Sequence, residues 1–436
     1  MKVFLTVAMV VCLCCGNVVA DNSWVQTSIS ASENIRDITS NASGVYLSTL
    51  SGKVLFSPDK GSTWMDESAG LIAGTYINKL FTTSDGTVVG GPVSSTTVYG
   101  GWYLDGTWKP ATGIPNASAP ELGIVAFVKD SSGNLLASTT WHGDMYRSTD
   151  NGRSYTKIRT GDAGGNPTTG YIYSLFLGPD HNIYAGTETN GIFVSQDGGA
   201  SFTGILGTGD PNANPAQYVG PYGGNIHVIG WSQSGLMFAG LKHGGGNGGI
   251  MNQLSDGTWV SNASMAVNAD TRSIVETPDG AYYTCIRKAA GYPQTYAQVM
   301  KSIDGGVTWT DFNAGLPVPT ATSSVCLNVD PAGYLYYGTA NEGVWRTAAP
   351  VYSVSPPLAG DANGDHIVDF KDYIVLEGNF GKTGKGFAGG DFNNDGVVDF
   401  KDYIVLEGNF GKTGVPEPAT LGLLALSGMG LLRRRS

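Results

Sequence analysis

NASGVYLSTL (residues 41–50) is the first of seven short segments in which a turn residue, usually glycine, precedes a β-rich strand. The other six are SDGTVVGGP (84–92), SSGNLLAST (131–139), PDHNIYAGT (179–187), QSGLMFAGL (233–241), PDGAYYTCI (278–286) and PAGYLYYGT (331–339). They recur at intervals of roughly 40–55 residues, a spacing typical of propeller blades. The repeat predicts an all-β, seven-bladed β-propeller over residues 21–349. Six or eight blades stay open, because the second and fifth repeats are irregular.

A second pattern lies between several of these segments. SPDKGSTW (57–64), STDNGRSY (148–155), SQDGGASF (195–202) and SIDGGVTW (302–309) share the form S-x-D-x-G-x-[ST]-aromatic, with decayed copies at 104–108 and 255–259. The pattern resembles the Asp-box, or BNR repeat, of sialidase-like propellers. Its aspartates (Asp59, Asp150, Asp197 and Asp304) are expected to accept backbone N–H bonds across a tight turn, with glycine at positive φ. We therefore interpret them as structural and not catalytic.

The N-terminal segment SWVQTSI (23–29) looks like the last strand of such a repeat. The seventh repeat, in turn, has no outer strand after residue 347. We therefore expect the N-terminal strand to complete blade seven and to close the ring without a covalent bond. A proline-bearing linker, residues 350–360, follows the propeller.

Residues 361–384 and 391–414 are a tandem repeat, identical from Val368 to Gly384 and from Val398 to Gly414. Each copy begins with oxygen-bearing side chains at positions 1, 3, 5, 9 and 12 of a calcium loop, with a backbone carbonyl at position 7. Oxygen ligands crowded this closely repel one another without a cation, so the repeat predicts two Ca²⁺ sites. An ion-free acidic turn is the alternative. The predicted ligands are Asp361, Asn363, Asp365, Ile367 (carbonyl), Asp369 and Asp372 in the first loop, and Asp391, Asn393, Asp395, Val397 (carbonyl), Asp399 and Asp402 in the second.

Each loop is followed by apolar residues at helical spacing, which end at a glycine such as Gly381. No comparable helix precedes the loop, and position 12 is Asp where an EF-hand has Glu. Two such loop–helix units resemble the dockerin module of bacterial extracellular carbohydrate-degrading systems, over residues 361–414. The resemblance implies a cohesin-like partner, of which the sequence itself shows nothing. His366 replaces the usual turn glycine in the first loop, so that site is expected to bind calcium more weakly.

The two ends of the chain both predict export. Residues 1–20 combine Lys2, an apolar run and Val18-Val19-Ala20, which predicts a secretory signal peptide cleaved after Ala20. Residues 415–436 contain Pro416-Glu417-Pro418, an apolar stretch and three arginines. As a helix the apolar stretch would be about 21 Å long, which is too short to cross the ~30 Å hydrocarbon core of a membrane. This tail closely resembles the PEP-CTERM sorting signal. The resemblance implies an exosortase and a secreted protein at the cell surface, outer envelope or extracellular matrix. An ordinary membrane tail is the alternative.

The amino-acid composition limits the classes of partner that the protein could bind. The chain carries a formal net charge of −11, and residues 21–360 hold nine Lys and seven Arg against twenty-five Asp and Glu. An acidic domain without basic clusters argues against nucleic acid or an anionic membrane as partner. Cys285 and Cys326 remain after signal cleavage, either as one disulfide or as two buried thiols.

Ring geometry predicts where a ligand would bind. Alternating strands place the turn glycines on one rim, and the opposite rim receives the long loops, where binding usually occurs. Trp and Tyr rings among polar groups suit sugars, although packing between blades is the alternative for each residue. The predicted ligand-binding residues are Arg36, Trp141, His142, Tyr222, His227, Lys242, His243, Arg272 and Arg287, and Tyr171 is a further channel residue.

Two functions stay open from the sequence. One is a surface-displayed propeller that binds glycan or protein, with the calcium module for attachment. The other is a glycoside hydrolase or lyase, sialidase-like or otherwise, acting on extracellular polysaccharide. Glycosidases need two carboxyl groups about 5–10 Å apart, and the weak candidates are Asp144, Glu188 and Glu342. The arginine motif of sialidases is missing, and Arg36 is the nearest candidate for it.

Overall fold

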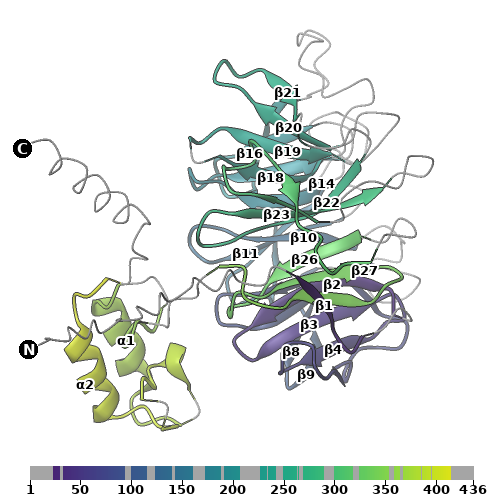
Figure 1. Cartoon of the computed structure of the whole chain (residues 1–436). Helices are drawn as coiled ribbons and strands as arrows, with labels where there is room; N and C mark the ends of the chain where they lie inside the picture. The colour runs from purple at the N-terminus through teal and green to yellow at the C-terminus, as the bar shows by residue number, and fades with distance from the viewer. Residues whose placement is uncertain are drawn as a thin grey trace, which may run out of the picture. The chain divides into compact units, whose positions relative to one another are not determined.

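The computed structural model describes residues 23–413 apart from 30–32, 94–99, 115–122, 140–142, 161–171, 188–190, 207–225, 233, 242–248, 263, 265–268, 289–298, 318–323, 353–357, 364–366, 384 and 394. The predicted signal peptide and sorting tail therefore lie outside the described residues. The chain divides into two compact units, Met1–Tyr352 and Ser353–Ser436. We call them the propeller unit and the C-terminal unit; Figure 1 labels many of their elements.

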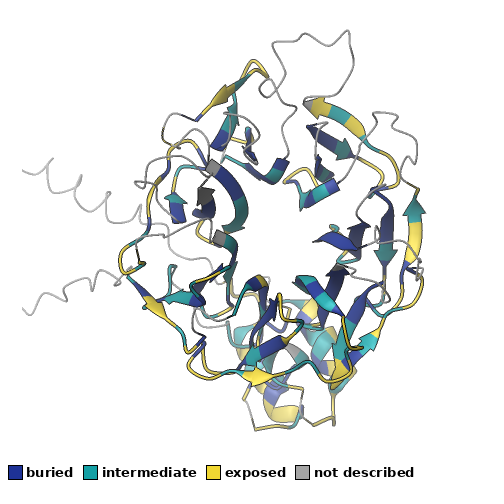
Figure 2. Ribbon diagram, turned by 90° about the vertical axis from the view of Figure 1, so that its right-hand side faces the viewer, coloured by how far each residue is buried: buried dark blue, intermediate teal, exposed yellow. Residues whose placement is uncertain are grey.

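Within its described residues the propeller unit contains seven four-stranded antiparallel sheets, arranged as a ring of blades (Figure 2). Blade one contains β2 (Ile35–Asn41), β3 (Gly44–Thr49), β4 (Val54–Ser57) and β5 (Met65–Asp66). Blade two contains β6 (Tyr76–Thr82), β7 (Val88–Val93), β8 (Trp102–Asp105) and β9 (Thr107–Pro110). Blade three contains β10 (Ile124–Lys129), β11 (Leu135–Thr139), β12 (Met145–Ser148) and β13 (Thr156–Arg159).

The remaining blades repeat this order. Blade four contains β14 (Ile172–Leu177), β15 (Ile183–Thr187), β16 (Ile192–Ser195) and β17 (Thr203–Leu206). Blade five contains β18 (Ile226–Trp231), β19 (Met237–Leu241), β20 (Gly249–Gln253) and β21 (Trp259–Ser261). Blade six contains β22 (Ala269–Glu276), β23 (Tyr282–Lys288), β24 (Val299–Ser302) and β25 (Thr310–Asp311). Blade seven contains β26 (Ser324–Val329), β27 (Leu335–Thr339), β28 (Val344–Thr347) and the N-terminal β1 (Trp24–Gln26). The seven-bladed prediction is confirmed.

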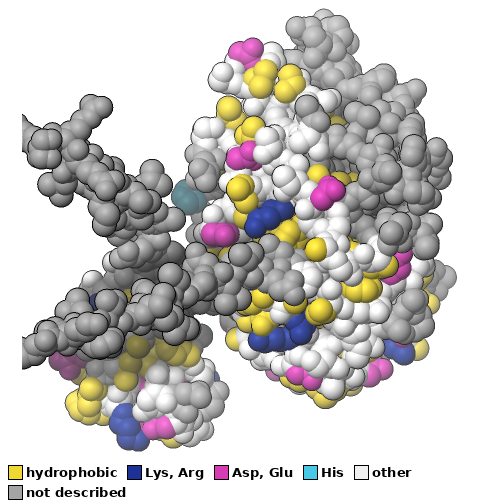
Figure 3. Space-filling view, in the orientation of Figure 1, with side chains coloured by type: hydrophobic (Ala, Val, Ile, Leu, Met, Phe, Trp, Pro, Cys, Tyr) yellow, Lys and Arg dark blue, Asp and Glu magenta, His cyan; other side chains and the backbone are white. Residues whose placement is uncertain are grey.

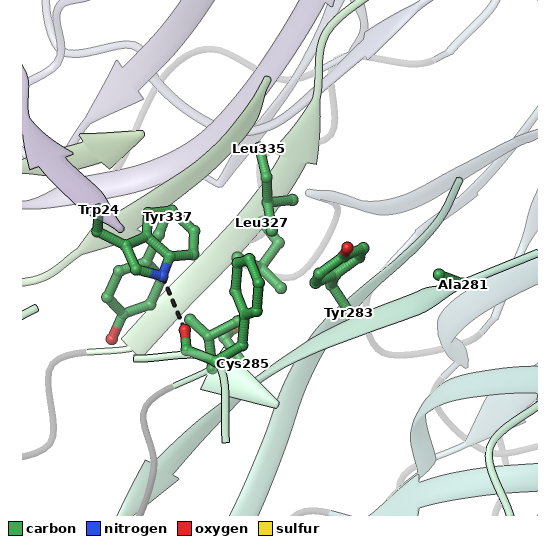
Figure 4. Close-up of a cluster of buried hydrophobic side chains, with 9 residues drawn as sticks. Trp24, Ala281, Tyr283, Cys285, Leu327, Leu335 and Tyr337 are labelled. Atoms are coloured by element: carbon green, nitrogen blue, oxygen red, sulfur yellow. Dashed lines mark hydrogen bonds between the residues drawn. The ribbon is translucent and has the colours of Figure 1, made fainter. Parts of the chain in front are cut away.

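The N-terminal strand closes the ring. β1 pairs antiparallel with β28, with Trp24 opposite Thr347. Trp24 is 3 % exposed, its indole Nε1 donates to the Phe312 carbonyl at 2.7 Å, and its ring packs edge-on against Phe312 and Tyr337. Figure 4 shows this cluster, where β1 meets side chains of blades six and seven. The strand predicted to complete blade seven therefore does so.

The turns between the third and fourth strands of four blades are built around Asp59, Asp150, Asp197 and Asp304, which we call the turn aspartates. The Asp197 carboxylate accepts the Ser201 N–H at 2.9 Å, the Ala200 N–H at 3.0 Å and the Ser195 hydroxyl at 2.7 Å. The Ser195 hydroxyl in turn accepts the N–H of Gly199, which has a φ of 95°. These are the backbone bonds predicted for the turn aspartates.

The hydrophobic core lies between neighbouring blades. One cluster, for example, joins Leu136 and Met145 of blade three to Ile172 and Phe193 of blade four. Cys285 and Cys326 are buried, free thiols. Burial raises the pKa of Cys285 to about 12 and that of Cys326 well above its ordinary value. Of the two alternatives for these cysteines, the structure has the free thiols.

Within its described residues the C-terminal unit contains α1 (Phe370–Asn379), a short 3-10 helix η2 (Phe387–Gly389) and α2 (Phe400–Asn409). Asp369 and Asp399 cap α1 and α2, and each forms a capping box with the aspartate three residues on. The repeats bond reciprocally: Val368 N–H donates to the Lys412 carbonyl, and Val398 N–H to the Lys382 carbonyl, both at 3.0 Å. The two repeats share one core, to which each contributes an equivalent valine and leucine: Val368 and Leu376 from the first repeat, and Val398 and Leu406 from the second.

Removing the ring-closing indole should destabilise the whole propeller. Trp24→Ala deletes a buried aromatic side chain and its hydrogen bond, so the free energy of unfolding should fall by about 3–5 kcal/mol in urea denaturation followed by circular dichroism. Val25→Ala, at a 36 % exposed position of the same strand, is the control and should change it by less than about 1 kcal/mol. Equal losses in the two variants would contradict the closing role of Trp24.

The turn aspartates should make stability depend on acid pH. Burial acts to raise the pKa of Asp197, but hydrogen bonds from Ser201 and Ser195 outweigh it and lower the pKa to about 2. Because the unfolded value is about 3.9, this stabilisation is present above that pH and is lost as the pH falls through about 2. Asp197→Asn should lower the free energy of unfolding by about 1 kcal/mol near neutral pH. The difference in the free energy of unfolding between wild type and this variant should disappear in acid. A difference that does not change with pH would contradict the role of the Asp197 charge. Asp311→Asn, an exposed control, should match wild type throughout.

Candidate binding site in the central channel

Every blade has an irregularity at the same place in its first strand. The pairing of β2 with β3 skips one residue between Ile35 and Asp37, and equivalent skips occur in β6, β10, β14, β18, β22 and β26. A β-bulge leaves its extra residue unpaired and re-aims that side chain. The seven skipped residues, which we call the bulge ring, are Arg36, Asn78, Val125, Tyr173, His227, Arg272 and Val325. All seven line one pocket of about 400 Å³.

The residues on either side of each bulge explain why the bulged side chain faces the channel. In five blades the preceding residue is an isoleucine that is almost fully buried, as Ile35 and Ile172 are. The following residue often bonds to the next blade. The Asp37 carboxylate accepts the Leu80 N–H at 2.9 Å, and the Ser174 hydroxyl donates to the Ile226 carbonyl at 3.1 Å. With both neighbours committed to the core or to the adjacent blade, the bulged residue is the one left for the channel.

The pocket is richer in cationic side chains than in anionic ones. Arg36 is exposed to the channel, and Lys79 Nζ lies 3.7 Å from an Asp37 carboxylate oxygen. Arg272 donates to Asp270 at 2.8 Å. Asp37 is the one carboxylate among the described pocket residues, and burial raises its pKa despite the nearby Lys79 and the Leu80 N–H. A ligand with several oxygen atoms would meet guanidinium, ammonium and amide donors here.

Two aromatic rings form part of the same wall. Tyr173 of blade four and His227 of blade five stack with ring centroids 5.2 Å apart and an interplanar angle of 23°. Because both are bulge-ring residues of adjacent blades, the stack lies at the pocket itself. The site thus combines flat rings with hydrogen-bond donors.

A second pocket, of about 540 Å³, lies among blades four, five and six. It is lined by His181, Glu276 and Tyr282, among others, and it shares Phe176 and Ile274 with the first pocket. Burial raises the pKa of Glu276. His181, which lies in the turn between β14 and β15, is thus part of a pocket wall.

Three of the predicted ligand-binding residues meet in the channel: Arg36, His227 and Arg272. The backbone of Arg287 lies in β23 opposite Asp270, and its side chain is outside the description. The other predicted binding residues lie outside the described residues; they are Trp141, His142, Tyr222, Lys242 and His243. The predicted channel residue Tyr171, the catalytic candidate Glu188 and the calcium ligand Asp365 also lie outside them.

The other two catalytic candidates are held in separate blades. Asp144 is 6 % exposed and forms an ion pair with Lys157 at 2.6 Å in blade three. Glu342 lies in the turn before β28 of blade seven, where its carbonyl accepts the Trp345 Nε1–H at 3.1 Å. The fold therefore holds these two residues in different blades.

Sequence reasoning missed Asn78, Lys79 and Tyr173. The sequence does contain a signal for these channel residues. In NIRDI (34–38), YINKL (76–80) and GYIYS (170–174), the residue that faces the channel directly follows an isoleucine near the start of the blade's first strand. The repeat spacing locates those strands, but the bulge that turns the next side chain inward depends on pairing with the second strand.

The second calcium-type loop of the C-terminal unit is organised by its own carboxylates. Asp391 accepts the N–H groups of Asp395 and Gly396 at 3.1 and 3.0 Å. Asp402 is fully buried and accepts those of Asn393 and Asp399 at 3.0 and 2.8 Å. Among the described residues no cluster of three or more His, Cys, Asp or Glu is placed to hold a metal ion. The oxygen donors nevertheless match the hard ligands that Ca²⁺ prefers.

The part of the chain that the structure describes holds no helix with the length and apolar character that a bilayer crossing requires.

Comparisons with known proteins identify one segment and one fold. Residues 414–436 match the model of the PEP-CTERM protein-sorting motif. A xyloglucanase from Paenibacillus sp is 25 % identical over 286 residues, which cover 62 % of this chain and 26 % of that protein, so the match spans about a quarter of the relative.

Solved structures show the same architecture. Virginiamycin B lyase from Staphylococcus aureus superposes with a TM-score of 0.53 at 11 % identity, covering 74 % of this chain and 97 % of that one. YCF48 from Cyanidioschyzon merolae gives 0.50 at 13 % identity, covering 74 % and 98 %. At these identities the likeness is one of fold alone. The chain is therefore a secreted seven-bladed β-propeller with a sorting motif at residues 414–436, and that motif implies processing by an exosortase.

Proposed function

We propose that this secreted propeller binds a glycan at its central channel and is attached to the cell surface or matrix through a calcium-stabilised C-terminal unit. The observation that carries the proposal is the bulge ring, because seven blades each direct one side chain into the same pocket. The pocket of about 400 Å³ lies within the ~300–1,000 Å³ range of small-ligand sites. It suits a sugar end or branch better than an extended chain.

The chemistry of the pocket supports a sugar ligand. Sugar rings have apolar faces that stack on aromatic rings and edges of hydroxyl groups that need donors and acceptors. Tyr173 and His227 supply the rings, and Arg36, Asn78 and Lys79 supply polar groups around them. The long-loop rim predicted to bind ligand is the rim nearest the bulges, since the bulges lie close to the start of each first strand.

A binding function is favoured over hydrolysis in this pocket. A glycosidase needs an acid and a second carboxylate about 5–10 Å apart. Asp37, the carboxylate among the described pocket residues, already accepts the Leu80 N–H and lies beside Lys79. It is therefore poorly placed to exchange protons with a substrate.

The second candidate function is a glycoside hydrolase acting on extracellular polysaccharide. The similarity to a xyloglucanase favours it, as does Glu276 in the second pocket, because a raised carboxyl pKa is what a general acid requires. The proposal remains binding, since Glu276 is the one carboxylate among that pocket's described lining residues.

A polysaccharide panel tests binding against hydrolysis. Wild type should be retained on at least one immobilised glycan without releasing reducing ends. Arg36→Ala and His227→Ala should each weaken retention about tenfold, because a lost polar or stacking contact is worth roughly 1.4 kcal/mol. Arg153→Ala is the matched control, since Arg153 pairs with Asp85 away from the channel.

Two results would count against the binding proposal. Retention unchanged in both channel variants would remove the bulge ring as the site. Release of reducing ends that Glu276→Gln abolishes would instead establish the hydrolase.

The calcium part of the proposal rests on the donor set of the two loops. When bound, Ca²⁺ would supply a positive centre for the loop carboxylates. In the second loop the ligands would be Asp391, Asn393, Asp395, the Val397 carbonyl, Asp399 and Asp402. The residues thirty positions earlier would hold the ion in the first loop. Asp399 also caps α2 by accepting the Lys401 N–H at 2.7 Å, so it joins the loop to the helix. The resemblance to dockerins supports a cohesin-like partner for this unit.

Calcium removal should affect the two units differently. Calorimetry of the full chain should show a C-terminal transition that moves to lower temperature with chelator and a propeller transition that does not, because only the unit that binds the ion gains stability from it. Asp395→Ala should reduce the calcium stoichiometry from two to one per chain, and Glu377→Gln on α1 should leave it at two. A C-terminal transition indifferent to chelator would contradict the calcium proposal.

A further inference from the structure

The second pocket of the propeller unit continues the first pocket along the channel wall. Along β14, residues 173–176 line the first pocket and residues 176–179 line the second. Along β18, residues 227–228 line the first pocket and residues 229–232 line the second. A ligand bound at the bulge ring is therefore within reach of the second pocket.

The two pockets differ in charge. Two arginines and a lysine line the first pocket, whereas the described lining of the second contains neither residue type. The titratable side chains that line the second pocket are His181, Glu276 and Tyr282. Among the residues that the structure describes, Glu276 forms no ion pair. A positively charged group on a ligand would therefore find an available counter-charge in the second pocket.

Aromatic side chains share this pocket with Glu276. Phe176, Trp231 and Tyr282 line it, and the first two are partly exposed and pack against the buried cluster that includes Ile229. The Tyr282 hydroxyl donates to the Trp231 carbonyl at 3.0 Å, which fixes blade six against blade five at this place. Aromatic rings attract a cation placed over their faces, and a carboxylate adds a full negative charge. The pocket therefore has the components of a site for an organic cation.

A cation would also relieve an electrostatic cost at Glu276. Partial burial raises the pKa of this carboxyl, because its charged form is poorly solvated there, and the Tyr282 hydroxyl only opposes the shift. A bound ammonium group stabilises the charged form. The surroundings favour the same sign of ligand charge, since residues 21–360 are acidic and Figure 3 shows acidic side chains, in magenta, spread over one face of the propeller unit. Such a surface raises the local concentration of a cation.

We propose that the second pocket binds the protonated amine of an amino sugar, with the rest of the glycan in the first pocket. The inference rests on the proposed glycan binding, because the continuity of the two pockets is what assigns the amine to a sugar. Glu276 meets the ammonium group as an ionised carboxylate, and Phe176 and Trp231 supply the surrounding aromatic surface. In this role Glu276 binds the ligand and does not transfer a proton.

Calorimetric titration of the full exported chain with three methyl glycosides tests the proposal. The methyl glycosides of glucosamine, N-acetylglucosamine and glucose differ at one substituent, and only the first carries a positive charge. Wild type should bind the glucosaminide about tenfold more tightly than either of the others. Methylamine carries the ammonium group without the sugar, as a lysine side chain would, and should bind about tenfold more weakly than the glucosaminide.

Two variants locate the amine within the molecule. Glu276→Gln should lower the affinity for the glucosaminide to that for the glucoside, because the counter-charge is gone. Glu67→Gln removes an equal charge directly after β5 of blade one, and this control should keep the preference for the amine. The glucosaminide should also change the tryptophan fluorescence of wild type, and Trp231→Phe should remove that change while calorimetry still detects binding.

Three results would overturn the proposal. They are equal affinities for the three glycosides, a methylamine affinity equal to that of the glucosaminide, and a preference for the amine that survives Glu276→Gln. Failure of the amine site is distinguishable from failure of glycan binding. A wild-type chain that is retained on a neutral glycan of the polysaccharide panel, but binds the three glycosides equally, keeps the proposed function and loses only the amine site.

Discussion

The pairing of β1 with β28 is the contact on which the rest of the propeller depends. A blade is a small sheet that cannot bury both faces alone, so each blade relies on its two neighbours. Blade seven has three strands from the end of the propeller and one from its beginning, and Trp24 anchors that strand with a hydrogen bond and two edge-on aromatic contacts. Closure converts a row of sheets into a ring, and only a ring has a central channel.

The candidate site follows from this closure. Each bulged residue is one side chain, and a single blade presents nothing that resembles a pocket. Seven bulges at equivalent depth bring residues as distant along the chain as Arg36 and Arg272 into one wall. The turns on the other rim, built by the turn aspartates, hold the strands in register with local hydrogen bonds. The turn aspartates and the cationic side chains of the pocket are thereby held in different parts of the propeller unit.

The C-terminal unit uses duplication in a different way. Its repeats exchange backbone bonds and share one small core, so each half completes the other. The same helices turn Phe370 and Phe400 outward, because ten-residue helices have one buried face at Leu376 and Leu406 and cannot bury the rest. One duplicated sequence thus yields both an internal core and a self-similar outer face.

The sequence by itself determined what depends on local pattern. Strand spacing predicted seven blades, SWVQTSI predicted the closing strand, the S-x-D-x-G turns predicted their own hydrogen bonds, and the tail predicted the sorting motif. Three channel residues, Arg36, His227 and Arg272, were also predicted from ring geometry. Only the tertiary structure decided that Asn78, Lys79 and Tyr173 join them, that Asp144 is bound to Lys157, and that Phe370 faces outward. The physical reason is that a turn or a strand is specified by residues within a few positions, whereas a bulge, an ion pair and an exposed face depend on partners brought together by the closed ring or by the paired repeats.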